Sequence, residues 1–191
     1  MAIDPEADDP VGSLASLAML LVPSDLPGPG WEVSQERTWP TGELDPDSEK
    51  SRRAVRAGSI TAWRSLEQTG VGRSAWFEVV PYATAADACV SLRQAPRYFE
   101  GTDDPGQQVV AQRFVEDRNL PGMADAWIFE KSLSGPSGDR LSRFVAGTVG
   151  HVLSIASCSG REGMWQLDDL VALALRQAER IRGALGPQLD G

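Results

Sequence analysis

The sequence is poor in the residues that most enzymes use for catalysis. It has one histidine, His151, and two cysteines among 191 residues. A serine or cysteine nucleophile needs an imidazole base that a third group orients, and no Gly-x-Ser-x-Gly motif is present. We therefore interpret His151 as a histidine in a solvent-facing turn.

Motifs for metals and cofactors are also missing. One histidine and two widely separated cysteines do not match a zinc-ligand spacing. Asp45, Asp47 and Glu49 resemble the start of a calcium loop, but the central glycine and terminal glutamate are absent. The chain has neither a phosphate-binding loop with its lysine nor a dinucleotide fingerprint. We expect no metal and no cofactor, and we interpret the acidic residues as a solvated loop.

Positive charge and long hydrophobic runs are scarce. The net charge is −9, and lysine occurs only at Lys50 and Lys131. Nucleic acids and anionic membrane surfaces attract basic proteins, so we expect neither as a partner. The longest apolar stretch, residues 14–22, ends before Pro23 and falls short of the roughly 20 residues that span a bilayer. Acidic residues precede it where a signal peptide carries positive charge, so we expect no membrane span and no export signal in this chain.

The remaining composition is that of a globular protein, with 41% hydrophobic and 24% charged residues. This length is sufficient for one sizeable core and does not require a second domain. We expect a disordered acidic tail over residues 1–12 and a single domain over residues 13–186. Ser13 is expected to cap the first helix.

Hydrophobic periodicity and turn residues predict the order helix, three strands, helix, four strands, helix. The predicted strands cover residues 31–39, 57–68, 73–82, 109–116, 124–133, 140–148 and 152–158, and the second helix opens at Thr84. Short turns between consecutive strands favour antiparallel meanders. The sequence therefore predicts an α+β fold with a twisted antiparallel sheet of about six or seven strands and helices packed mainly on one face.

The last third of the chain carries the clearest pattern. Gly150 suits the tight turn between the last two strands because glycine tolerates a positive φ. The closing helix places apolar residues on one stripe at three-and-four spacing: Leu167, Leu170, Val171, Ala174, Ala178, Ile181 and Leu185. We expect this stripe to cover a face of the sheet.

One surface stands out as a candidate ligand-binding site. Two neighbouring predicted strands carry aromatic and polar side chains on the same face, and a third strand adds an aromatic residue if its register allows. The candidate residues are Trp63, Trp76, Trp127, Thr61 and Ser65, with Glu78 on the same face. A half-polar, aromatic sheet surface is typical of a ligand cleft. The alternative is that a helix or loop covers these residues as ordinary core.

Two further pairs leave alternatives open. Glu78 and Glu130 lie in the middle of predicted strands, and two carboxylates on one face could support hydrolysis; otherwise each is a solvated outer-face residue. Cys89 and Cys158 permit one disulfide, or they are two buried free thiols.

Several local patterns together resemble the extracytoplasmic sensor-type domains of actinobacteria. These domains occur as lipoproteins and as the outer domain of some mycobacterial receptor serine/threonine kinases. The resembling segments are residues 20–31 (LLVPSDLPGPGW), residues 77–80 (FEVV) with the helix at 85–89 (AADAC), and residues 144–155 (FVAGTVGHVLSI) with the helix at 172–182. A second resemblance, to the PsbP-like antiparallel fold, depends on element order alone.

The first resemblance implies a non-enzymatic domain with a central antiparallel sheet and a cleft for a hydrophobic, envelope-derived ligand. It also implies a helix-to-strand disulfide between Cys89 and Cys158, and a place in the cell envelope or outside the cell. The sequence departs from the family in lacking a visible export signal or lipid-anchor cysteine. The alternatives are a cytoplasmic protein-interaction or structural module without a small-molecule site, and a carboxylate-dependent hydrolase. No oligomeric state follows from the pattern.

Overall fold

The computed structural model describes residues 10–40, 60–94, 107–117, 120–136 and 138–186. The elements follow the predicted order. They are α1 (Pro10–Ala18), the short 3-10 helix η1 (Pro23–Asp25), β1 (Trp31–Pro40), β2 (Ile60–Gln68), β3 (Arg73–Pro81), α3 (Ala85–Gln94), β4 (Gln108–Asp117), β5 (Ala124–Ser134), β6 (Arg140–Val149), β7 (Val152–Gly160) and α4 (Leu167–Leu185). The predicted α+β fold with one antiparallel sheet is confirmed.

The seven strands form one sheet in the order β1-β2-β3-β7-β6-β5-β4, and all neighbouring pairs are antiparallel. Consecutive strands pair as the predicted meanders, with one exception: β3 pairs with β7 rather than with β4. The last strand of the chain therefore joins two meanders at the centre of the sheet. Gly150, the first residue of the two-residue turn between β6 and β7, has a φ of 58°, which glycine tolerates.

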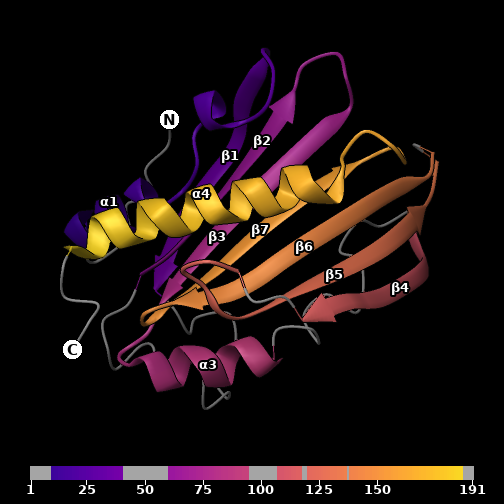
Figure 1. Ribbon diagram of the computed structural model, residues 1–191. Helices are drawn as coiled ribbons and strands as arrows, with labels where there is room; N and C mark the ends of the chain where they lie inside the picture. Colours follow the sequence, from indigo (N-terminus) through magenta and orange to yellow (C-terminus); the bar gives the residue numbers. More distant parts are fainter. Residues whose placement is uncertain (1–9, 41–59, 95–106, 118–119, 137, 187–191) are drawn as a thin grey trace.

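One face of the sheet, here called the helical face, packs against α4 and α1 (Figure 1). The predicted stripe of α4 is confirmed: Leu170, Ala174, Ala178 and Ile181 are buried in the main hydrophobic cluster, together with Phe77 of β3. Apolar side chains of β2, β5, β6 and β7 complete this cluster, including Ala62, Leu66, Ile128, Val145 and Ala156. This burial removes a large apolar area from water and holds α4 against the sheet.

The opposite face, here called the aromatic face, carries Trp63, Trp76, Trp127, Phe129 and Phe144. Alternation along the strands places these residues opposite the helical-face residues, as the strand registers show. Helix α3 packs on part of this face through β6 and β7, and its residues Ala88 and Leu92 belong to a second hydrophobic cluster. Two of the three longer helices therefore lie on one face, as predicted.

The helix termini agree with the sequence in one case and differ in another. Thr84 caps α3 as predicted, because its Oγ1 accepts a hydrogen bond from the Asp87 backbone at 3.1 Å. The first helix begins at Pro10, within the segment predicted as a tail, so Ser13 lies inside α1 rather than at its N-cap. Proline is favoured in the first turn of a helix because its missing N–H has no helical partner there. Residues 1–9 lie outside the described residues.

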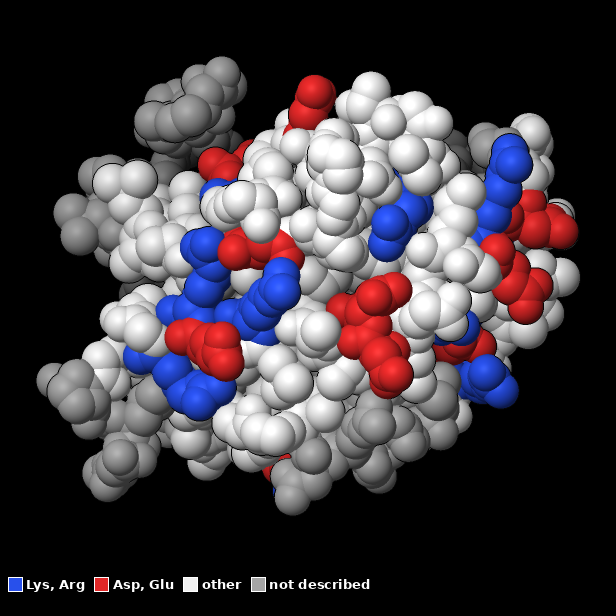
Figure 2. All heavy atoms as spheres, turned by 45° about the horizontal axis from the view of Figure 1, so that its top comes forward, with Lys and Arg blue, Asp and Glu red and all other residues white. Residues whose placement is uncertain are grey.

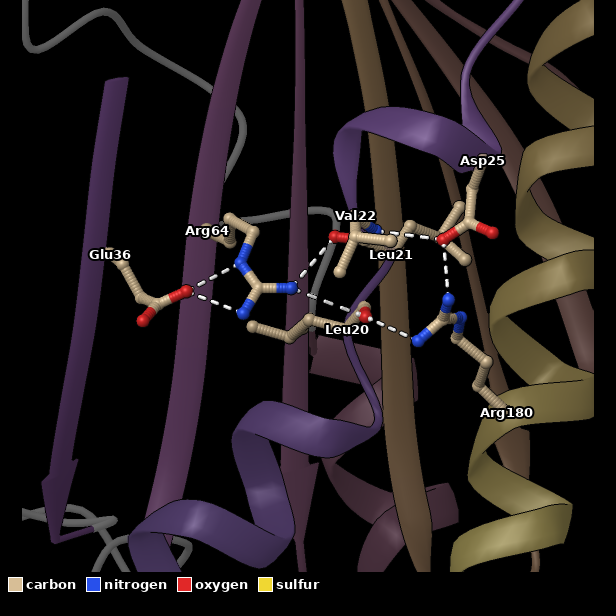
Figure 3. Close-up of polar contacts among 7 residues, drawn as sticks. All are labelled: Leu20, Leu21, Val22, Asp25, Glu36, Arg64 and Arg180. Atoms are coloured by element: carbon tan, nitrogen blue, oxygen red, sulfur yellow. Dashed lines mark hydrogen bonds and ion pairs between the residues drawn. The ribbon is translucent and has the colours of Figure 1, made fainter. Parts of the chain in front are cut away.

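Hydrogen bonds and ion pairs of two arginines hold the segment after α1 against the sheet and α4 (Figure 3). Arg64 of β2 is 8% exposed; it pairs with Glu36 of β1 at 2.5 Å and donates to the carbonyls of Leu20 and Leu21 at 3.3 and 2.9 Å. From the other side, Arg180 of α4 forms an ion pair of 2.8 Å with Asp25. The chain between α1 and β1 is therefore held between two basic side chains.

Candidate functional site

The strand registers bring the predicted candidate residues to one face. Ser65 of β2 lies opposite Trp76 of β3, and Trp63 lies opposite Glu78. Thr61 follows on the same side of β2 because strand side chains alternate. The predicted grouping of these residues is therefore present in the fold, while their role in binding stays a prediction.

Trp127 lies on this face but not beside Trp63. The register runs from Trp127 through Ala146 and Ile155 to Glu78, and then to Trp63. Four strand spacings separate the two indoles, which is about 19 Å along the sheet at ~4.8 Å per spacing. Trp127 packs instead in the second hydrophobic cluster with the residues of α3. The candidate site therefore centres on β2 and β3, and Trp127 belongs to its covered end.

A row of aromatic side chains across the face was not recognised in the sequence. Phe129 and Phe144 have ring centroids 6.1 Å apart, and Phe144 lies 5.8 Å from Trp76 in an edge-to-face arrangement. Phe114 on the edge strand β4 lies 6.1 Å from Trp127. The alternation within each strand was visible in the sequence, but the β3–β7 pairing that aligns the row was not.

The exposure of these side chains divides the face into two parts. Phe129, Phe144 and Trp127 are buried, whereas Trp63 and Trp76 are half-buried. On the β5–β6 side, the aromatic residues are therefore covered as ordinary core, which was the alternative to a ligand site. At the β2–β3 side, two indole rings remain in partial contact with solvent.

The structure separates the two carboxylates that a hydrolase would need. Glu78 lies on the aromatic face with Trp63. Glu130 lies on the helical face, because it pairs in register with Arg143, and Arg143 pairs with Cys158 of the helical-face cluster. Glu130 accepts hydrogen bonds from Arg143 at 2.6 Å and from Arg113 at 3.0 Å. Burial tends to raise the pKa of Glu130, but these two guanidinium groups outweigh it and lower the pKa. The two carboxylates therefore cannot act as an acid–base pair.

The disulfide implied by the family resemblance does not form. Cys89 lies on α3, and its Sγ is 3.9 Å from Thr148 Oγ1, whereas Cys158 is buried in the helical-face cluster. The sheet lies between the two thiols, and both are free. Burial raises the pKa of the Cys158 thiol, so this group stays protonated and unreactive.

His151 lies in the turn that the sequence predicted. Its backbone carbonyl accepts a hydrogen bond from the Tyr82 N–H at 2.9 Å, which ties the β6–β7 turn to the end of β3. The side chain is half-buried. This contact gives the turn a structural role.

Charged side chains of both signs are interspersed on the side of the molecule that Figure 2 shows. Basic and acidic groups lie next to each other there. A nucleic-acid site requires a continuous basic surface. This side of the molecule has no such surface among the described residues. None of the helices in the described part of the chain has the length and hydropathy of a membrane span.

No family model matches the sequence, and no curated protein is similar to it in sequence. Solved structures with a similar fold include the extracellular domain of PknH from Mycobacterium tuberculosis. It has a TM-score of 0.59 and 14% identity, and the match covers 91% of this chain and 97% of that chain. An Rv0999 ortholog from Mycobacterium smegmatis matches with a TM-score of 0.43 and 11% identity over 91% of this chain and 99% of that chain. The similarity to the PknH domain shows that the chain shares the fold of that extracellular domain, as the sequence resemblance implied.

Proposed function

We propose that this chain is a non-catalytic, sensor-like domain that works outside the cytoplasm and binds an apolar, envelope-derived molecule on its aromatic face. The observation that carries the proposal is the difference in side-chain burial between the two faces of the sheet. Phe77 and the stripe of α4 form the core on the helical face. Trp63 and Trp76, on the other face, remain half-buried.

Half-buried indoles suit the recognition of an apolar molecule. A tryptophan ring offers a large, rigid apolar surface, and burying it against a ligand gains free energy at a small cost in side-chain entropy. Ser65 and Glu78 lie opposite these rings in the β2–β3 register and supply polar neighbours. Such a mixture of flat apolar surface and a few polar groups is typical of small-molecule sites.

Two observations support an extracytoplasmic, non-catalytic role. The fold is similar to that of the extracellular domain of PknH, and the sequence segments that resemble actinobacterial sensor domains contribute buried residues such as Leu20, Phe77 and Val145 to it. The separation of Glu78 from Glu130 across the sheet removes the one acid pair that the sequence offered. Fractionating cells of the source organism tests the extracytoplasmic location.

Tryptophan fluorescence tests the binding proposal. Purified protein is titrated with polarity-fractionated lipid extracts of an actinobacterial envelope, and the emission of wild type is compared with single Trp→Phe variants. Trp63→Phe and Trp76→Phe should each lose much of the response, because these rings lie at the proposed site. Trp165→Phe is the matched control, since Trp165 is buried in the helical-face cluster. Equal responses in all variants, or none in wild type, would contradict the proposal.

A protein-interaction role is the second candidate, and the exposed edge strand β4 favours it. Val110 and Phe114 are 66% and 48% exposed there. Large exposed apolar side chains on a sheet edge are frequent contact points for other proteins. A photo-crosslinking residue at position 114, with position 90 on α3 as control, distinguishes the two roles. A protein adduct specific to position 114 supports the interaction role.

A further inference from the structure

Ser157 of β7 lies at the centre of the aromatic face. In the strand register it stands between Phe144 of β6 and Trp76 of β3. It is 1% exposed, and its hydroxyl has no hydrogen-bond partner in the part of the chain that the structure describes. A buried hydroxyl without a partner destabilises the fold, because it loses its bonds to water without replacement.

Two aromatic rings close over this serine. Strands β6 and β3 lie on either side of β7, so their backbones are about 10 Å apart. The rings of Phe144 and Trp76 nevertheless approach to 5.8 Å between centroids, at 61°. They therefore lean toward each other above β7, and the small side chain of Ser157 leaves the space in which they meet.

Neighbouring serines on the same face differ from Ser157 in having partners. Ser142 donates to Ser159 at 2.9 Å, and Ser74 accepts from Arg140 at 3.2 Å. These contacts explain why serine is acceptable at those positions. No contact of this kind explains Ser157, where alanine would leave the same space without an unpaired hydroxyl.

The chemistry of this position defines the group that would satisfy it. A serine hydroxyl forms one or two hydrogen bonds with a neutral oxygen and carries no charge. Glu78 lies two residues from Trp76 on this face, and Lys131 Nζ lies 5.5 Å from the Phe144 ring centroid, so the nearby charges are of opposite sign and favour no ionic group. The surrounding rings favour an apolar body next to that oxygen. The fitting ligand class is an apolar molecule with a neutral oxygen head, such as a long-chain alcohol or an acylglycerol.

We propose that Ser157 is the hydrogen-bonding residue of a ligand subsite that Trp76 and Phe144 close in the unliganded protein. The apolar body of the ligand displaces the contact between the two rings, and its neutral oxygen bonds to Ser157 Oγ. This inference rests on the ligand-binding role proposed above and specifies the ligand chemistry of that role.

Two probes of equal chain length test this subsite: 1-octanol, which has a hydroxyl head, and 1-chlorooctane, which does not donate hydrogen bonds. Affinities are measured by calorimetry for wild type, Ser157→Ala and Ser142→Ala. Wild type should prefer 1-octanol by roughly tenfold, the equivalent of one net hydrogen bond. Ser157→Ala should bind both probes equally, and without ligand it should melt at the same or a higher temperature. Ser142→Ala, the control on the same face, should keep the preference.

The outcomes separate this inference from the broader role. Equal binding of both probes by wild type overturns the subsite and leaves the apolar binding face intact. A retained preference in Ser157→Ala, or a lower melting temperature of that variant without ligand, also overturns the subsite, because the hydroxyl then acts elsewhere or is structural. No binding of either probe overturns the subsite together with the ligand-binding role.

Discussion

The two faces of one sheet differ in how completely they are packed. On the helical face, Phe77 is fully buried and the buried Arg64 is paired with Glu36 and two carbonyls. On the aromatic face, Trp76, which directly precedes Phe77 along β3, is half-buried. Because the same strands form both faces, this difference cannot come from strand propensity. One face therefore holds the fold together, and under the proposed function the half-buried indoles of the other face contact the ligand.

Substitutions at two adjacent residues of β3 should give the largest difference in the free energy of unfolding. Phe77→Ala should reduce the free energy of unfolding by about 3–5 kcal/mol, because it leaves a cavity in the main cluster. Trp76→Ala should cost clearly less, because its ring is only half-buried. Urea denaturation followed by circular dichroism measures both values. Equal losses would show that the aromatic face is as much a part of the core as the helical face.

The arginine contacts on the helical face should give the next largest effect. Arg64→Met should destabilise the protein by about 2 kcal/mol, because it leaves Glu36 and the carbonyl of Leu21 without their donor, while the carbonyl of Leu20 keeps only its 3.5 Å contact with Arg180. Glu36→Gln is the matched control and should cost about 1 kcal/mol or less, since the arginine keeps both carbonyls. Both are measured by urea denaturation. If Arg64→Met is as stable as wild type, the buried arginine does not hold the segment after α1.

The ion pairs of Glu130 should make the helical face sensitive to acid. The folded state lowers the pKa of Glu130, so it binds fewer protons there than the unfolded state does. The stability from this group is present at neutral pH and is lost as the pH falls below the ordinary glutamate value of about 4.3. The stability difference between wild type and Glu130→Gln should therefore shrink from pH 7 to pH 3. A constant difference over that range would exclude this linkage.

The cysteines should show the smallest effect, a difference in labelling rate without a change in stability. Cys158 is buried with a raised pKa, whereas Cys89 is partly exposed on α3. A thiol reagent at pH 8 should label Cys89 in the folded protein and reach Cys158 only after denaturation. Mass spectrometry of the labelled peptides identifies the sites. A disulfide-linked peptide containing both cysteines would contradict the fold, because the sheet separates them.

Local sequence patterns predicted most of this fold, because helices, caps and strand alternation depend on residues that are close in the sequence. The stripe of α4 and the alternation of Trp63 with Ala62 follow from side-chain periodicity. The Thr84 cap follows from the residue type at the start of the helix. The pairing of β3 with β7 did not follow, because residues far apart in the sequence determine it. That pairing places Ser157 beside Trp76 and puts Cys158 and Cys89 on opposite sides of the sheet.

The candidate site was therefore predictable only in part. The β2–β3 hairpin showed that Trp63 and Trp76 share a face, since a short turn fixes its register. The distance of Trp127 from them depends on the strand order and could not be known. The contacts of Arg64 with the chain before β1 also depend on tertiary structure, because an arginine within a strand looks like a solvated residue in the sequence.

Fluorine NMR of protein labelled with 5-fluorotryptophan tests the central claim most directly. Trp31 and Trp165 lie in the helical-face cluster, with ring centroids 5.6 Å apart, whereas Trp63 and Trp76 lie on the aromatic face. Single Trp→Phe variants assign the resonances, and 1-octanol is the titrant. We expect the resonances of Trp63 and Trp76 to shift while those of Trp31 and Trp165 stay in place. Shifts confined to Trp31 and Trp165, or no shift at any tryptophan, would contradict the account.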